Sequence, residues 1–154
     1  RDEFYVQQCA GRLQPVLQTL RALKKAGVWL EITTLIIPGL NDSLEELKEM
    51  ANFIVSLDEN IPWHLSAFHP SYRLTDRPPT PVDSLYQARK VGLEAGLHYV
   101  YLGNVPLSDS RHTYCPQCGE KVIDRSSLVA RTIGLKNGTC SECGQGIPGL
   151  GMAT

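Results

Sequence analysis

Four of the five cysteines form two CxxC pairs near the end of the chain, and each pair is followed directly by a glycine. The pairs are Cys115 with Cys118 and Cys140 with Cys143. A tight turn over each pair aims both thiolates inward, and the glycine supplies the positive φ that such a turn needs. Two of these turns together provide four sulfur ligands in a tetrahedron. The spacing is typical of a zinc ribbon.

Tetrahedral sulfur ligation suits zinc or a single iron of the rubredoxin type equally well. A redox dithiol and a pair of disulfides are further alternatives. We expect zinc (Zn²⁺), because structural zinc is the common occupant of closed four-thiolate sites. A closed site leaves no position for a substrate, so these thiols are expected to stabilise the tail and not to perform catalysis. The remaining Cys9 is expected to be a small buried apolar residue.

The first 105 residues alternate amphipathic helices with apolar strands. Apolar residues at three- and four-residue steps predict helices over 11–26, 43–57 and 82–96, the second of them with a capping box of Ser43 and Glu46. Strands are predicted within 28–37, 63–70 and 97–105. The first of these strands is nearly continuous in apolar character, which favours a strand covered on both faces.

This alternation is typical of a parallel α/β sheet with right-handed crossovers. Three such units do not close an eight-stranded barrel, so we expect the last part of a barrel or of an open sheet. The chain starts at Arg1 without a methionine, which suggests a fragment. Glycines, cysteines and short polar strands follow Val105, so the predicted domains are residues 1–105 and a ribbon-like tail of residues 106–154.

The composition is that of an ordinary globular protein, with 42% hydrophobic and 20% charged residues. A formal net charge of −1 disfavours binding to nucleic acid, and no apolar run is long enough to cross a membrane. No signal peptide opens the chain, so we expect a cytoplasmic protein. Thiols are kept reduced there, which favours metal binding over structural disulfides.

Several polar residues lie on the predicted strands. His69 ends the second strand, and ligands bind at the carboxyl ends of barrel strands. Glu31 and Thr33 share one face of the first strand and His64 lies on the second, so these side chains either line a substrate cavity or pair internally. Asn41 and Asp42 are expected to close a turn or to cap the next helix. His98 and His112 are expected to be ordinary surface or loop histidines.

The segments "VWLEITTLIIPGLNDSLEELKEMANFI" and "IPWHLSAFHPSY" resemble the C-terminal half of radical S-adenosylmethionine (radical SAM) enzymes related to the pyruvate formate-lyase-activating enzyme. The segments "PPTP" and "GLEAGLHYVYLGNVP" and the "YCPQCG" to "CSECG" tail look similar to the radical SAM enzymes of the AmmeMemoRadiSam system. The resemblance covers nearly the whole chain, and these motifs occur together and in order.

The resemblance implies a partial (β/α) barrel that holds a [4Fe-4S] cluster and S-adenosyl-L-methionine. Reductive cleavage of the cofactor would give a 5'-deoxyadenosyl radical for hydrogen abstraction. By the same likeness, His69 matches a histidine that contacts S-adenosylmethionine, and Ile36, Ile37 and Pro38 match a strand end that packs against the adenosyl group. For these last residues a role in the core and turn is an equal alternative. No catalytic residue is assigned.

The family ligates its cluster with a CxxxCxxC motif, which this sequence lacks. The chain by itself is therefore expected to be inactive, while a complete protein with upstream strands would hold the cluster and need an electron donor. The substrate, a protein or a small molecule, is not specified. A noncatalytic module that presents a zinc ribbon to a protein partner is the alternative hypothesis, and nucleic acid and membrane are not expected partners.

Overall fold

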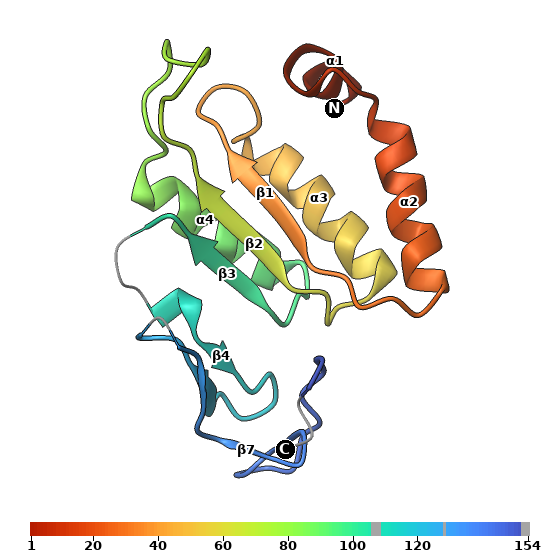
Figure 1. The fold of residues 1–154 in the computed structure, drawn as a ribbon, viewed down its shortest axis with the longest axis vertical. Coiled ribbons are helices and arrows are strands. Elements are labelled where there is room, and N and C mark those ends of the chain that lie inside the picture. Colours follow the sequence, from red (N-terminus) through yellow and green to blue (C-terminus); the bar gives the residue numbers. More distant parts are fainter. Residues whose placement is uncertain (106–108, 128, 152–154) are drawn as a thin grey trace.

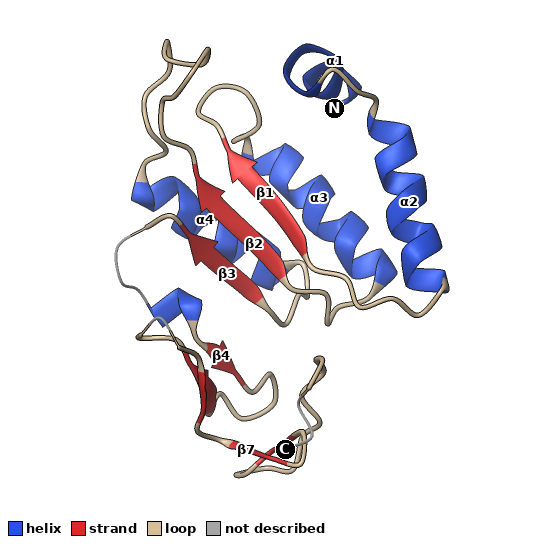
Figure 2. Ribbon diagram, in the orientation of Figure 1, coloured by secondary structure: helices blue, strands red, loops and turns tan. Residues whose placement is uncertain are grey.

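A computed structural model describes residues 1–105, 109–127 and 129–151 of the chain, which form a mixed α/β structure (Figures 1 and 2). The helices are α1 (Asp2–Cys9), α2 (Leu13–Lys25), α3 (Leu44–Leu57), α4 (Val82–Glu94) and the 3-10 helix η1 (Asp109–Arg111). The strands are β1 (Ile32–Ile36), β2 (Trp63–Ala67), β3 (Val100–Gly103), β4 (Thr113–Tyr114), β5 (Lys121–Asp124), β6 (Arg131–Thr132), β7 (Leu135–Lys136) and β8 (Thr139–Cys140).

The larger part of the molecule is a three-stranded parallel sheet in the order β1-β2-β3. This arrangement confirms the alternation of helices and strands that the sequence predicts. The parallel pairing brings the carboxyl ends of the strands, at Ile36, Ala67 and Gly103, to one edge of the sheet (Figure 1). We call this the carboxyl edge. Strand β2 begins at the predicted residue, whereas β1 and β3 begin later than predicted, and residues 28–31 are not part of β1.

Helices α3 and α4 cover one face of the sheet, behind the strands in Figure 2. Alternate residues of the strands point into this layer and form the main core with the buried faces of the two helices. Trp63 is fully buried in it, and its indole N–H donates to Thr34 Oγ1 at 2.9 Å. Ser43 caps α3 by accepting the Glu46 N–H at 3.3 Å, as the capping-box pattern predicts.

The other face of the sheet is open within the described residues. Thr33 and Leu35 on β1 are exposed, so the expectation of a first strand covered on both faces is wrong for the described part of the chain. Helix α2 is amphipathic, yet none of its residues is buried, and Val16 and Leu23 are exposed. A large exposed apolar patch normally packs against another part of the protein or against a partner. The β1 side of the sheet and α2 are therefore the parts of this fold with apolar surface still free to pack.

Gly92 lies inside α4 where the helix crosses Trp63. A Cβ at this position would lie 3.0 Å from two carbons of the Trp63 ring and 3.1 Å from a Val100 methyl. Gly92→Ala is expected to lower the free energy of unfolding by about 1 kcal/mol or more, because overpacking against a fixed ring outweighs the better helix propensity of alanine. Urea unfolding measures this change.

Gly146→Ala is the control, since a Cβ there meets no atom within 4 Å. A Gly92→Ala protein that is more stable than the wild type would show that Trp63 yields, and would contradict the prediction.

The smaller part, which we call the ribbon, comprises the described residues from 109 to 151. A three-stranded antiparallel sheet in the order β4-β5-β6 is followed by the hairpin β7-β8. Its small core is Cys115, Val122, Ile123, Cys140 and Ile147. The predicted domain boundary at residues 105 and 106 borders residues 106–108, which lie outside the described residues. In the part of the chain that the structure describes, no helix is both long and apolar enough to cross a membrane.

Candidate metal centre and strand-end site

The four predicted cysteine ligands meet at one point of the ribbon. Their sulfur atoms all lie within 4.8 Å of one another. The Sγ atoms of Cys115 and Cys143 are 3.5 Å apart, and those of Cys118 and Cys140 are 3.6 Å apart. Zn–S bonds of about 2.3 Å in a tetrahedron place sulfurs about 3.8 Å apart, whereas a disulfide needs about 2.05 Å. The spacing therefore fits a metal ion and does not fit disulfides.

Both CxxC turns have the same backbone hydrogen bonds. Gly119 N–H donates to the Cys115 carbonyl and Gly144 N–H donates to the Cys140 carbonyl, each at 2.9 Å. Both glycines have φ of +77°. This left-handed conformation is costly for residues with a Cβ, so the glycines that the sequence places after each pair are required by the turns. The predicted turn geometry is confirmed.

Three of the four sulfurs have opposing pKa shifts, because backbone N–H groups favour the thiolates while burial and the neighbouring thiols oppose them. Burial raises the pKa of the Cys115 thiol, but the backbone N–H groups of Cys118 and Gln117 outweigh it and lower the pKa to about 7. At Cys118 the N–H of Glu120 lowers the pKa, while desolvation and the three neighbouring thiols raise it to about 12. Four thiolates repel one another unless a cation lies between them. A metal ion resolves this conflict, so the donor set fits a bound metal.

Cys9 differs from its expected environment. It is an exposed free thiol at the end of α1, and α1 has no buried residue. The prediction of a small buried apolar residue is therefore wrong. The reason is tertiary: α1 lies at the margin of the fold, where the described residues offer no core for it (Figure 1).

Two buried polar side chains shape the carboxyl edge. Asn41 accepts the Ile37 N–H at 2.7 Å and donates to the Leu35 carbonyl at 2.9 Å, while Asp42 accepts the Gly39 N–H at 2.9 Å. The expected turn-closing role of Asn41 and Asp42 is confirmed. Thr80, from the "PPTP" segment, accepts the Phe68 N–H at 2.8 Å and donates to the Ile36 carbonyl at 2.5 Å. It thereby joins the ends of β1 and β2.

The four residues matched by resemblance to a cofactor site have different surroundings, and Ile37 is buried like Ile36. His69 is exposed at the end of β2, with its Nε2 3.5 Å from the Asn104 carbonyl oxygen at the end of β3. Pro38 is half-buried, and its carbonyl accepts from Arg77 Nη1 at 3.1 Å. Ile36 is fully buried in the core on the helix side of the sheet. Its side chain supports the strand end from within the core, which is the alternative role considered from the sequence.

Glu31 and His64 lie on the open face at the opposite end of the strands. They pair with each other, with Glu31 Oε2 2.8 Å from His64 Nε2, and both line the same cavity. The sequence left two alternatives, internal pairing and the lining of a cavity, and both apply to this pair. Thr33 is exposed on the same face of β1 but does not line that cavity.

Sequence reasoning missed several residues of this cavity and only partly described His112. Of its two expected settings, surface or loop, His112 has the loop, but it is buried there and its Nδ1 accepts the backbone N–H of Arg125 at 2.9 Å. Arg125, Tyr99 and Tyr101 also converge on the cavity beside Glu31. Tyr99 and Tyr101 are two positions apart, so strand alternation places them on one face of the sheet, which is a weak signal for a shared site. Nothing in the sequence places Arg125 beside them.

No protein-family model matches this sequence. The chain is similar to the uncharacterized protein MJ0808 of Methanocaldococcus jannaschii, with 44% identity over 148 residues. The match covers 94% of this chain. It covers only 44% of MJ0808. The chain therefore spans less than half the length of the relative it matches.

Proposed function

We propose that this chain is the C-terminal portion of a radical SAM enzyme, in which the three strands complete a partial (β/α) barrel. The carboxyl edge is the main support for the proposal. His69 and Asn104 lie side by side on adjacent strand ends, and parallel α/β sheets bind their ligands at this edge. The rigid turn held by Asn41 and the link through Thr80 would fix the cofactor-binding surface.

The uncovered surfaces of the fold also support a larger barrel. The β1 side of the sheet would pair with additional strands, and the apolar residues of α2 would pack against them, with the open face turned to the barrel interior. The 44% sequence identity to a protein more than twice as long is compatible with such a larger barrel. Because the whole protein would have the activity, its substrate and its electron donor belong to the proposal and not to this chain.

The cofactor group would supply a 5'-deoxyadenosyl radical for hydrogen abstraction. The cysteines of this chain do not fit the cluster, since four of the five form the ribbon centre and the fifth is Cys9 on α1. The cluster would be held by residues outside this sequence. His69 would bind S-adenosylmethionine through its ring, and Pro38 would pack against the adenosyl group.

In this proposal the ribbon centre holds zinc and has a structural role. A closed set of four thiolates leaves no position for substrate, and the small ribbon core needs the metal for stability. Reduced thiols are required for such a centre, so a cytoplasmic location forms part of the proposal.

The proposal is tested by S-adenosylmethionine binding to the complete protein, reconstituted without oxygen. His69→Ala is expected to weaken binding about 2- to 10-fold, the effect of losing one hydrogen bond between ring and cofactor. Isothermal titration calorimetry measures the affinity. His98→Ala is the matched control, because His98 bonds to Asn60 at the other end of the strands. Unchanged affinity in the His69→Ala protein would reject this role of His69.

A second candidate function is a noncatalytic module that presents the ribbon to a protein partner. Three apolar residues of the ribbon favour it, since Val129, Ile133 and Leu150 are 70%, 56% and 77% exposed. Reductive cleavage of S-adenosylmethionine by the complete protein separates the two functions. Absence of cleavage by a cluster-loaded protein would leave the interaction module as the better hypothesis.

A further inference from the structure

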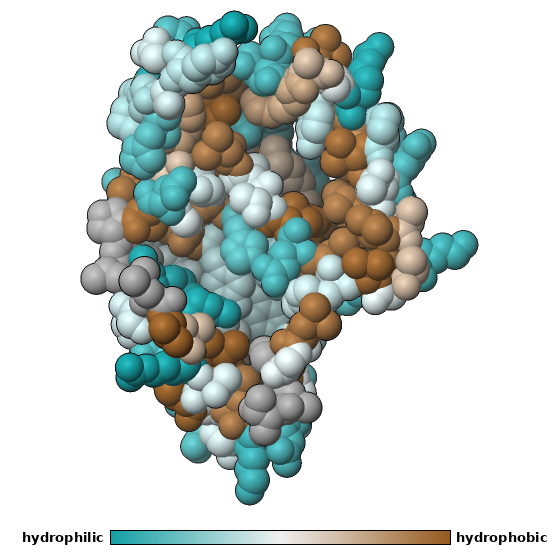
Figure 3. Space-filling model, in the orientation of Figure 1, coloured by the Kyte–Doolittle hydropathy of each residue, from teal (hydrophilic) through white to brown (hydrophobic). Residues whose placement is uncertain are grey.

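A cavity of about 610 Å³ lies between the open face of the sheet and the ribbon. Figure 3 shows the hollow between the two parts of the molecule, with hydrophilic side chains within it. It is formed at the amino ends of the strands, opposite the carboxyl edge, by Trp29, Glu31 and Tyr99 on the sheet side and by Arg125 and Leu150 on the ribbon side. Its volume is that of a pocket for a small molecule.

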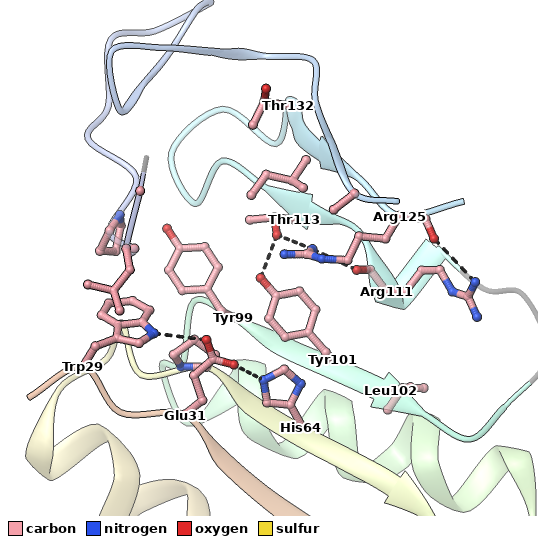
Figure 4. A pocket seen from close by; sticks show the side chains of 17 residues that line it. Trp29, Glu31, His64, Tyr99, Tyr101, Leu102, Arg111, Thr113, Arg125 and Thr132 are labelled. Atoms are coloured by element: carbon pink, nitrogen blue, oxygen red, sulfur yellow. Dashed lines mark hydrogen bonds and ion pairs between the residues drawn. The ribbon is translucent and has the colours of Figure 1, made fainter. Parts of the chain in front are cut away.

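The floor of the cavity is a connected set of polar and aromatic side chains (Figure 4). Trp29 Nε1 donates to Glu31 Oε1 at 3.0 Å, and Glu31 Oε2 lies 2.8 Å from His64 Nε2. The His64 ring stacks on Tyr101 with 5.3 Å between ring centroids. Hydrogen bonds from Trp29 and then His64 lower the pKa of Glu31, so its carboxylate is charged at neutral pH and both of its oxygens are already engaged.

The ribbon contributes a guanidinium group to the opposite wall. Arg125 Nη1 donates to Thr113 Oγ1 at 2.7 Å and to the Arg111 carbonyl at 3.1 Å. The guanidinium carbon lies 5.3 Å from the centroid of the Tyr101 ring. These bonds fix the guanidinium group in place beside the cavity, where its positive charge can attract a ligand.

Tyr99 provides an independent sign of a ligand. The residue is 4% exposed, and its buried hydroxyl has no hydrogen-bond partner among the described residues. In Figure 4 this hydroxyl points from the sheet towards the ribbon, across the cavity. Burial raises the pKa of Tyr99, so the hydroxyl stays protonated and can donate. Buried polar groups are normally paired, so a cavity that leaves one unpaired is suited to an acceptor from outside the chain.

The charges in the cavity specify the kind of ligand. The guanidinium of Arg125 faces the cavity, whereas that of Arg111 points away from it towards the Arg125 carbonyl (Figure 4). The carboxylate of Glu31 has both oxygens engaged, by Trp29 and by His64. The remaining walls are mainly aromatic or apolar, with Thr113 and Thr132 as polar exceptions. We propose that this cavity binds a small aromatic anion, with its carboxylate or phosphate on Arg125 and the Tyr99 hydroxyl and its ring against Trp29 and Leu150.

This inference does not rest on the proposed radical chemistry, because the cavity and the carboxyl edge are at opposite ends of the strands. It also implies that the shape of the cavity depends on the metal centre. Thr113 lies two residues before Cys115, and Leu150 follows the last cysteine by seven residues. The ribbon wall of the cavity thus depends on the same turns that hold the four sulfurs, without any contact between ligand and metal.

The experiment uses the zinc-loaded chain of 154 residues with phenyl phosphate and benzoate as probes and benzyl alcohol as the neutral control. Calorimetry gives the affinity, and quenching of Trp29 fluorescence reports the place of binding. At least one anion is expected to bind saturably, at least about 10-fold more tightly than benzyl alcohol, since the alcohol lacks the charge-assisted bonds. Comparison of the two anions distinguishes a phosphate from a carboxylate ligand.

Two variants test the proposed contacts. Arg125→Gln is expected to weaken binding about 10-fold or more, and Tyr99→Phe about 2- to 10-fold. Tyr99→Phe is expected to keep the fold, because the lost hydroxyl has no partner among the described residues. This variant therefore tests the proposal even if Arg125→Gln perturbs the ribbon. Arg131→Gln, on exposed β6, is the matched control and is expected to bind like the wild type. No saturable binding up to about 10 mM of either anion, or equal affinity in the Tyr99→Phe protein, would overturn the proposal.

Discussion

A strong chelator is expected to unfold the ribbon and to leave the parallel sheet folded. The ribbon has a core of only a few side chains, whereas the sheet and its two helices share a separate and larger core. Structural zinc contributes about 10 to 16 kcal/mol of apparent binding free energy in small domains, more than the stability of most domains. Removing the metal should therefore remove nearly all stability from the ribbon.

Hydrogen exchange measured by mass spectrometry tests this expectation. Amides of β5 (Lys121–Asp124) should lose protection in the chelator, and those of β2 (Trp63–Ala67) should keep it. Elemental analysis should give one zinc per chain before treatment. Cys140→Ser should behave like the chelated protein, and Cys9→Ser, at an exposed thiol outside the cluster, should behave like the wild type. A ribbon that stays protected without metal would contradict the prediction.

Thr80→Val is expected to lower the free energy of unfolding by about 2 to 5 kcal/mol. Valine has nearly the shape of threonine but cannot replace the hydroxyl, which accepts the Phe68 N–H and donates to the Ile36 carbonyl. Both backbone groups would remain buried without a partner, and each such group costs about 1 to 3 kcal/mol. The loss should also loosen the carboxyl edge, because Thr80 joins two of its strand ends.

Urea unfolding followed by circular dichroism measures the change. Thr19→Val is the matched control, since Thr19 is exposed on α2 and its hydroxyl bonds only to the Pro15 carbonyl one turn earlier. That control should change the stability by no more than about 0.5 kcal/mol. A Thr80→Val protein as stable as the control would mean that water reaches the freed groups, and the edge would then be less rigid than the hydrogen bonds indicate.

Local patterns in the sequence were sufficient for much of the architecture. Periodic apolar residues predicted α2, α3 and α4, and the alternation of elements predicted parallel strands. The CxxCG spacing predicted the four-cysteine cluster, because both ligands and turn lie within a few residues of one another. Asn41 was also predictable for this reason, since its partners at Leu35 and Ile37 are close in sequence.

Features that depend on distant residues could not be predicted in this way. Ile36 is buried and Cys9 is exposed because of the helices that do or do not pack beside them. The residue type alone does not show which helices pack nearby. Thr80 bonds to a carbonyl 44 positions away, a distance along the chain over which the local pattern has no information. Its role as a link between strands therefore appeared only in the folded structure.

The sequence by itself determined helices α2, α3 and α4, the three parallel strands in outline and the four-cysteine cluster, because short-range periodicity and turn chemistry encode them. Only the tertiary structure decided that Glu31 pairs with His64 and that Arg125 lies over Tyr101. The physical reason is that both contacts join residues far apart in the sequence. The first links the residue just before β1 to the neighbouring strand β2, and the second links the sheet to the ribbon. The second contact and the cavity depend on how two separate cores are placed against each other.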